Sequence, residues 1–243
     1  MELNLSVTSE VVMLWVAGAL TLMALTIGAR LVARSAAVSG RFANLVDAMV
    51  GFARTSIAEE FLGEHSARWF GFVGSLFFFI LFCNILGKLP IPGFETPTAD
   101  INVTGALAVM VFVVAQVVGM FKLGPIGYFK KKFLLPGAPM LLRILMIPIM
   151  VLVLLAEPFS LAVRLFANMF AGHMVMLTFA TAEMVGGVWL LHHQNWAVKS
   201  VATLPFALTV ILLGFEFFVA FIQAFIFALL SALYLSESLE EHH

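Results

Sequence analysis

The stretch FFVAFIQAFIFALLSALYLS, residues 217–236, decides the fold, because it contains no charged residue over 20 positions. About 20 residues let an α-helix cross roughly 30 Å of hydrocarbon at 1.5 Å per residue. Charge-free stretches of similar length occupy 11–29, 69–87 and 101–121. Two further apolar tracts, around 141–191 and 200–215, are interrupted by single polar residues. These patterns predict several membrane-embedded helices.

The composition supports the same fold class. Of 243 residues, 62% are hydrophobic and 11% are charged, and the mean hydropathy is +1.07. A soluble domain carries about 25% charged residues. We therefore predict an all-α polytopic membrane protein, with about five membrane-embedded helices and one amphipathic helix in a single membrane domain over 1–243. The expected elements are a first transmembrane helix at 11–33, an amphipathic helix at 41–63, a helical hairpin at 69–121 and a long hairpin at 140–237.

The same composition narrows the possible ligands. A net charge of −1 indicates no nucleic-acid partner. Cys83 is the only cysteine, which excludes an internal disulfide, and we interpret it as a small core residue. We expect no nucleotide site, metal or other cofactor, because the chain has no Gly-rich phosphate loop and no Cys/His cluster. The N-terminus lacks the basic region of a signal peptide, so the first span is expected to be retained.

The basic residues predict the orientation. None precedes the first span, and two loops carry most of them: Arg30, Arg34, Arg41, Arg54 and Arg68 after the first span, and Lys122, Lys130, Lys131, Lys132 and Arg143 after the third. Loop 90–100 carries no Lys or Arg. The positive-inside rule then places the N-terminus outside and both basic loops, with the C-terminus, in the cytoplasm.

The segment between the first two spans has the pattern of an amphipathic helix. Its apolar residues recur at intervals of three and four, which places them on one helical face. The predicted apolar face consists of Phe42, Leu45, Val46, Met49, Val50, Ala53, Ile57 and Phe61, with Arg41, Asn44, Asp47 and Arg54 towards the other face. We expect this helix at the membrane interface or packed along the bundle.

A few polar residues interrupt the apolar tracts of the second half. Ionisable groups inside a membrane are costly and are therefore functional candidates by default. The candidates are Glu157, Arg164, Asn168, His173, Glu183, Glu216 and Gln223.

Helical geometry arranges these candidates at two levels. Arg164 and Asn168 are four residues apart and share a face, as do Glu216 and Gln223, seven apart. If Gln223 lies level with Arg164 in an antiparallel hairpin, Glu216 lies about 10.5 Å and His173 about 13.5 Å along in the same direction. The register therefore predicts Arg164 beside Gln223, and His173 beside Glu216.

The two levels differ in chemistry. His173 and Glu216 can both titrate, so together they could pass a proton wherever water reaches them. Arg164 stays charged in any protein environment, so it would repel a hydrated proton and keep a partner's carboxylate ionised. The alternatives are an Arg164 that binds backbone carbonyls or lipid phosphate, and a purely structural His173–Glu216 pair.

The remaining candidates have simpler alternatives. Asn168 and Gln223 could be ordinary hydrogen-bonding contacts between helices. Glu157 could be a proton entry or exit group, or an acid at a helix start before Pro158. Glu183 precedes Trp- and His-containing sequence typical of a membrane interface, so we expect it near the outer surface.

Four stretches together resemble subunit a of the F-type ATP synthase. They are SLAVRLFANMFAGH at 160–173, FIQAFIFALLSALYLSES at 221–238, NILGKLP at 84–90 and PTADINVT at 97–104. The resemblance covers about residues 80–240, with a weaker fit of the first helix.

The resemblance implies roles for particular residues. Arg164 matches the family's essential arginine, which faces the proton-carrying carboxylates of the rotating c-ring. Asn168 and Gln223 match polar neighbours of that arginine. His173 and Glu216 match a His/Glu pair that occurs exchanged in some bacterial relatives, and Gly87 stands where certain relatives carry an acid. The family fold also makes the last two helices a long, strongly tilted antiparallel hairpin.

The implied function is that of a stator proton channel without a catalytic site of its own. Two offset half-channels would load and unload the c-ring carboxylates, and so couple ion flow to rotation and ATP synthesis. The implied partners are the c-ring, the b-type subunits of the peripheral stalk, the rest of the FoF1 complex and membrane lipid. The expected location is the bacterial inner membrane, or the mitochondrial inner membrane for an organelle-encoded chain.

Two other functions fit the residues less well. A stand-alone secondary transporter could use a buried Arg164 to bind an anion, but such folds show internal repeats, which this chain lacks. A purely structural assembly subunit would not need the titratable pair His173 and Glu216.

Overall fold

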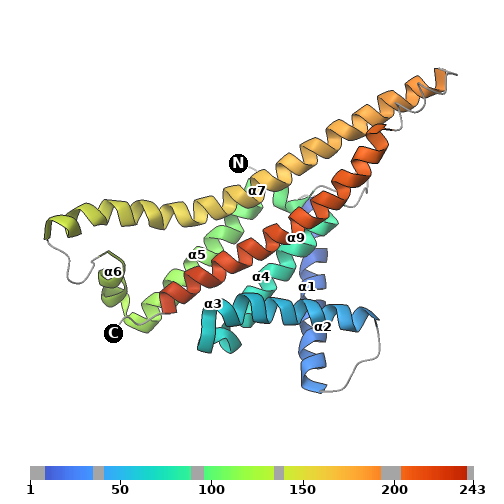
Figure 1. Cartoon of the computed structure of the whole chain (residues 1–243). Helices are drawn as coiled ribbons and strands as arrows, with labels where there is room; N and C mark the ends of the chain where they lie inside the picture. Colours follow the sequence, from blue (N-terminus) through green and yellow to red (C-terminus); the bar gives the residue numbers. More distant parts are fainter. Residues whose placement is uncertain (1–8, 35–40, 89–95, 134–139, 193–203, 240–243) are drawn as a thin grey trace, which may run out of the picture.

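A computed structural model describes residues 9–34, 41–88, 96–133, 140–192 and 204–239. These residues are helical almost throughout and include no strand. Five helical stretches are long and apolar enough to cross a membrane: Val11–Arg30, Ala43–Leu86, Ile101–Leu123, Leu145–Thr178 and Leu208–Leu239. The predicted all-α, multi-pass membrane fold is confirmed (Figure 1).

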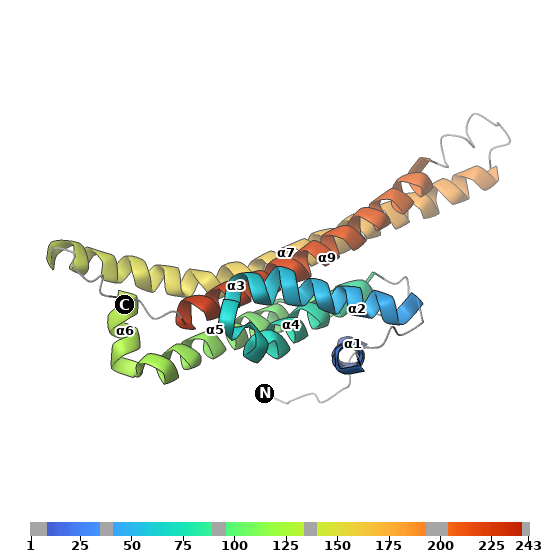
Figure 2. The ribbon, with the colours of Figure 1, turned by 60° about the horizontal axis from the view of Figure 1, so that its bottom comes forward.

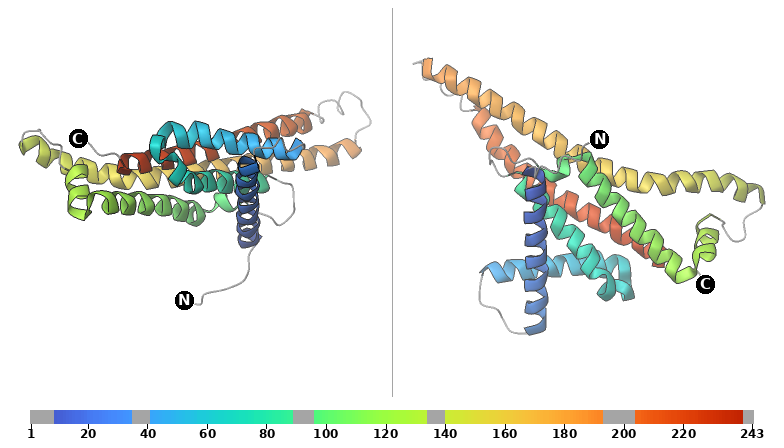
Figure 3. Two further views of the ribbon diagram at one scale, coloured as in Figure 1. Left: turned by 90° about the horizontal axis from the view of Figure 1, so that it is seen from below. Right: turned by 180° about the vertical axis from the view of Figure 1, so that it is seen from behind.

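The first helix stands across the second. α1 (Ser9–Arg34) crosses α2 (Arg41–Ala53) and packs against α4 (Figure 3). At the crossing, a Cβ atom on Gly28 would lie 2.8 Å from a methyl carbon of Val50. The two backbones approach this closely because residue 28 has no side chain.

The amphipathic segment is a helix interrupted by one wider turn. α2 continues into a π-helical turn, Arg54–Glu59, then α3 (Glu60–Leu62) and a 3₁₀ turn, Gly63–His65, in which Gly63 has a φ of +49°. The buried face consists of Val46, Val50, Ala53, Ile57, Ala58 and Leu62. The periodicity misplaced Leu45, which is 57% exposed, and the side chain of Phe42 lies outside the described part.

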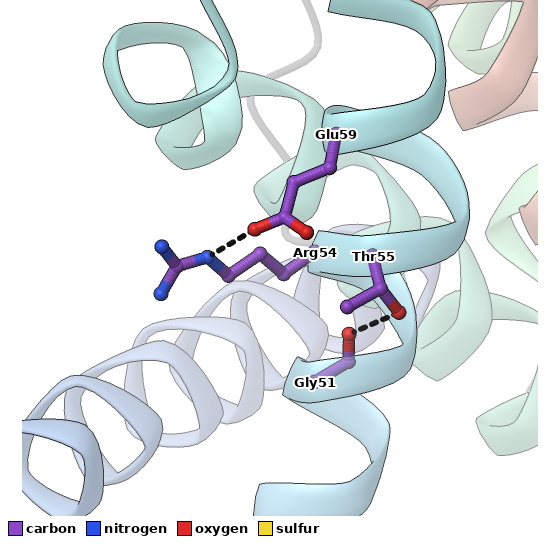
Figure 4. Close-up of polar contacts among 4 residues, drawn as sticks. All are labelled: Gly51, Arg54, Thr55 and Glu59. Carbon is purple, nitrogen blue, oxygen red and sulfur yellow. Dashed lines mark hydrogen bonds and ion pairs between the residues drawn. The ribbon is translucent and has the colours of Figure 1, made fainter. Parts of the chain in front are cut away.

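The π-helical turn changes which of the later residues lie on the buried face. It adds one residue to a turn, so Ala58 and Leu62 join the face and Phe61 is only half-buried. Arg54 Nε contacts Glu59 Oε1 at 3.0 Å across this turn, five residues apart, and Thr55 Oγ1 donates to the Gly51 carbonyl at 3.0 Å (Figure 4). Both interactions lie on the exposed side of the segment.

The two helices expected as a hairpin at 69–121 are separated by the last helix. α4 (Ser66–Leu86) and α5 (Ile101–Leu123) both pack against α9 (Leu204–Leu239), which lies between them (Figure 1). A 3₁₀ turn, Pro97–Ala99, leads into α5, and Asp100 caps α5 by accepting a hydrogen bond of 2.8 Å from the Asn102 amide.

Small side chains let α9 enter the bundle. Ala220, Ala224, Ala228 and Ala232 recur every fourth residue and are fully buried. Small residues at this spacing allow the backbones of membrane helices to approach closely. Aromatic side chains fill the adjoining core, with Phe77 contacting Phe221 edge-on at 5.8 Å between ring centroids.

The longest helix pairs with α9 as an antiparallel hairpin. α6 (Pro125–Phe133) is followed by α7 (Met140–His192), whose second half lies beside the first half of α9 in both views (Figures 1 and 2). Pro148 and Pro158 lie inside α7 and do not end it. Each removes one backbone hydrogen bond, and the helix is visibly bent along its length.

Candidate functional site

Arg164 lies on the outer side of α7. Its side chain is exposed, as are those of Ser160, Ala167 and Ala171, which lie on the same side of the helix. The opposite side is buried in the bundle through Leu161, Leu165 and Met169. A permanent positive charge therefore stands among small side chains on a face that no described residue of this chain covers.

A cavity of about 240 Å³ lies between α7 and α9, beyond Arg164 in the direction of the α7 C-terminus. Its wall includes the polar residues Lys88, Asn168 and Glu216. Exposed residues, among them Ala171 and Phe215, also line it, so it reaches the surface of the chain. Since one water takes about 30 Å³ of liquid volume, the cavity has room for several.

Glu216 is paired with a lysine in this cavity. Lys88 Nζ lies 2.9 Å from Glu216 Oε2, and the two side chains are 5% and 9% exposed. Neither carboxylate oxygen accepts a hydrogen bond of good geometry from the described residues, and Asn168 Nδ2 donates none. Three buried polar atoms thus lack hydrogen bonds around space that water can fill.

Gly172 makes this arrangement possible. A Cβ atom there would lie 2.8 Å from Lys88 Nζ and 3.1 Å from Glu216 Oε1. The contact also fixes the register of the hairpin, because it places Gly172, the neighbour of His173, against Glu216. The geometry agrees with the register expected from the sequence, although the side chain of His173 lies outside the described part.

The turn that carries Lys88 is anchored by buried hydrogen bonds. Asn84, which is fully buried, donates to the Ala220 carbonyl of α9 at 3.3 Å and accepts from Thr98 Oγ1 at 2.7 Å. Thr96 Oγ1 donates to the Gly87 carbonyl at 3.1 Å and occupies the space where a side chain on Gly87 would stand. Residue 87 must therefore be glycine for Thr96 to pack here, and the charged residue of this turn is its neighbour, Lys88.

The expected positions of two further candidates, Gln223 and Glu183, are not confirmed. Gln223 is buried on α9, 6% exposed, and no contact between it and Arg164 is recorded. The side chain of Glu183 lies outside the described part, so its expected place near the outer surface stays a prediction.

Glu157 lines a second, smaller cavity. This cavity of about 10 Å³ lies among α5, α6, α7 and α9, and its polar lining residues are Gln116, Lys132, Glu157, Tyr234, Glu237 and Ser238. Such a volume holds about one water. The alternative of an acid at a helix start is wrong for Glu157, because α7 continues through Pro158 in both directions.

Sequence reasoning missed Lys88 as a site residue. The available signal was a lysine in NILGKLP, directly after the charge-free stretch 69–87. The motif was used only as a family marker, and the contact joins residues 128 positions apart, which helical periodicity cannot predict. Lysine is almost never fully buried unless paired, which should have raised the question of its partner.

The comparisons with known proteins decide the family. A family model described as ATP synthase A chain matches residues 11–236. The chain belongs to the ATP synthase subunit a family. It is 40% identical to ATP synthase subunit a of Myxococcus xanthus over 99% of this chain and 75% of that protein. It is 39% identical to ATP synthase subunit a 2 of Chlorobium luteolum over 96% of this chain and 65% of that protein. It is 36% identical to ATP synthase subunit a of Granulibacter bethesdensis over 98% of this chain and 90% of that protein.

Membership in this family makes the chain a multi-pass membrane component of an ATP synthase complex, associated with proton transport and ATP synthesis. It disfavours the stand-alone transporter, which would act without such a complex. The roles of the individual residues need an argument from the site itself.

Proposed function

We propose that this chain is the stator proton channel of an F-type ATP synthase, with two offset half-channels separated by Arg164. The observation that carries the proposal is the exposed position of Arg164 on the outer face of α7. A guanidinium that cannot lose its proton is costly on a membrane-embedded face, unless a partner brings a negative charge to it. The carboxylates of a c-ring are such charges, and the small residues around Arg164 let a ring helix approach.

The cavity around Glu216 supports the outer half-channel. A proton would enter from the outer side, bind to Glu216 and pass, with His173, to a ring carboxylate near Arg164. The neutralised carboxylate can then move into lipid, because burying the neutral form costs far less than burying the charged one. Asn168 lies between Arg164 and this cavity and would orient water there through its free donor.

The cavity at Glu157 supports the cytoplasmic half-channel. After nearly a full turn, the ring carboxylate would meet Arg164 from the other side and lose its proton. Glu157, with Tyr234 and Glu237 in the same lining, would lead that proton to the cytoplasm. Arg164 keeps the two paths apart because a hydrated proton cannot pass a fixed positive charge at close range.

The proposal includes partners and orientation. The c-ring covers the Arg164 face, and b-type subunits and the rest of FoF1 hold this chain against the ring in the bacterial inner membrane. The N-terminus lies outside and the C-terminus in the cytoplasm. Each proton that crosses 100 mV releases about 2.3 kcal/mol, so several are pooled per ATP.

The test measures proton flux in membranes that contain the assembled complex. Arg164→Ala is expected to abolish ATP-driven proton pumping, while passive proton leak stays the same or rises. Arg54→Ala is the matched control, because Arg54 is also exposed but pairs with Glu59 on the amphipathic segment. Normal pumping by Arg164→Ala would refute the stator channel.

A further inference from the structure

Lys88 is the residue of the cavity that the proposed function leaves unexplained. A channel that loads protons onto Glu216 does not by itself need a lysine 2.9 Å from that carboxylate. Lys88 also belongs to no long helix; it lies in the turn after α4, held by the bonds of Asn84 and Thr96. The chain thus positions a charge from a separate element against α9.

A purely structural ion pair would be arranged differently. A buried pair gains stability only if further hydrogen bonds satisfy its remaining polar atoms. Here both Glu216 oxygens lack well-formed hydrogen bonds, and the pair faces a cavity with room for several waters. The arrangement leaves the carboxylate accessible to a proton carried by water.

Lys88 is also the charge that dominates the surroundings of Glu216. It is the one other ionisable group in the described lining of the cavity; the side chain of His173 lies outside the described part. The other charged side chains described on α9 and on the elements packed against it do not line the cavity; they include Glu157 and Arg164 on α7, Asp100 and Lys122 at the ends of α5, Arg68 on α4, Arg54, Glu59 and Glu60 on the amphipathic segment, and Glu237 on α9.

We infer that Lys88 is a positioning residue of the outer half-channel: its ammonium holds the Glu216 carboxylate turned into the cavity, and thereby sets the external pH range in which this half-channel takes up protons. This inference rests on the proposed function. In the step, a hydronium in the cavity gives one proton to a Glu216 oxygen, which leaves water and a neutral carboxylic acid beside the ammonium; that proton then moves on, and the carboxylate is restored.

The expected direction follows from the charge. An opposite charge close by favours the ionised form of a carboxylate, whereas a buried carboxylate without one favours its protonated form. Removing the ammonium leaves the buried Glu216 carboxylate without its counter-charge. The pH optimum of proton flow should therefore move to higher pH, by about 1 unit.

The experiment is ATP synthesis by the reconstituted whole complex, driven by a fixed proton gradient and measured over a range of external pH. We expect Lys88→Met and Lys88→Gln to move the optimum to higher pH by about 1 unit. Lys88→Arg keeps the charge and should stay near the wild-type optimum. Lys130→Met is the control, because it removes an exposed lysine on α6 far from the cavity lining.

Each other outcome overturns the inference. An unchanged optimum in both neutral variants would show that Lys88 does not control Glu216. A shift in Lys88→Arg as large as that in Lys88→Met would show that packing, not charge, matters. If neither neutral variant assembles while Lys88→Arg does, Lys88 is a structural counter-charge. Arg164→Ala in the same preparation separates the two proposals. If Arg164→Ala is inactive while the Lys88 variants keep the wild-type pH profile of ATP synthesis, only the role of Lys88 is refuted. If Arg164→Ala has normal activity, the stator channel is refuted.

Discussion

At the scale of single residues, Gly172 offers the sharpest test of the cavity geometry. A methyl group from Gly172→Ala would stand 2.8 Å from Lys88 Nζ and 3.1 Å from Glu216 Oε1, so both buried side-chain ends must move apart. Since a displacement of about 1 Å can cost on the order of 100-fold in a proton-transfer site, we expect proton pumping to fall about tenfold with assembly retained. The measurement is ATP-driven acidification of membrane vesicles.

Gly214→Ala provides the matched control for this prediction. Gly214 lies on α9 close to Glu216, and a Cβ atom there would meet no other atom within 4 Å. Its pumping rate should equal the wild-type rate. Equal rates in both variants would show that the close packing at Gly172 has no part in proton flow.

The types and spacing of the residues explain which part of the site could be predicted from the sequence. Arg164, Asn168 and Glu216 stand out because polar groups in apolar tracts are rare. Helical spacing predicts His173 level with Glu216, and the structure places its neighbour Gly172 against Glu216. The pairing of Glu216 with Lys88 could not be predicted, because it depends on where the turn after α4 is anchored. That anchor is the bond from Asn84 to a carbonyl of α9, a contact across 136 positions.

At the scale of elements, the stripe of alanines on α9 lets this helix approach its neighbours closely. Ala228 is fully buried, so Ala228→Leu must push side chains or backbones apart. Overpacking of this kind costs about 1–3 kcal/mol of folding free energy. The midpoint of thermal unfolding of the purified protein in detergent should fall accordingly.

Ala106→Leu is the comparison for this element-scale prediction, since Ala106 on α5 is exposed. Its effect should stay within about 0.5 kcal/mol, as for most surface substitutions. If both variants unfold at the same midpoint, the surroundings of Ala228 are not as tightly packed as the structure indicates.

The elements also show the limits of periodicity. A repeat of three and four found the amphipathic segment, but it assumed an unbroken α-helix. The π-helical turn at Arg54–Glu59 rotates the later residues, so Leu62 is buried while the helix before it exposes Leu45. Likewise, the alternative that Glu157 is an acid at a helix start assumes that α7 begins near Pro158, yet Pro158 lies inside α7.

At the scale of the whole molecule, the two ends of the bundle differ in charge. Among the described short elements, α2, the π-helical turn Arg54–Glu59, the turn before α4, and α6 carry basic residues and lie at the lower side of Figure 1 with the C-terminal end of α9, whereas Lys88, in the turn after α4, is buried against Glu216. The N-terminal end of α1 and the 3₁₀ turn Pro97–Ala99 lie towards the upper side. Apart from the buried Lys88, these basic segments lie at one side of the bundle, which the positive-inside rule predicts to be the cytoplasmic side.

This arrangement predicts which positions a membrane-impermeant thiol reagent can reach. In a Cys83→Ala background, Glu64→Cys and Lys130→Cys should react only in inside-out vesicles, because both side chains are exposed and belong to the turn before α4 and to α6, which lie at the lower side of Figure 1. Thr8→Cys, directly before α1, should react only in right-side-out vesicles. Ala228→Cys, buried between helices, should react in neither and so controls for leaky membranes.

The opposite pattern would reverse the orientation and place the Lys88–Glu216 cavity on the cytoplasmic side. Protons would then enter at Glu157, and the roles proposed for the two cavities would have to be exchanged.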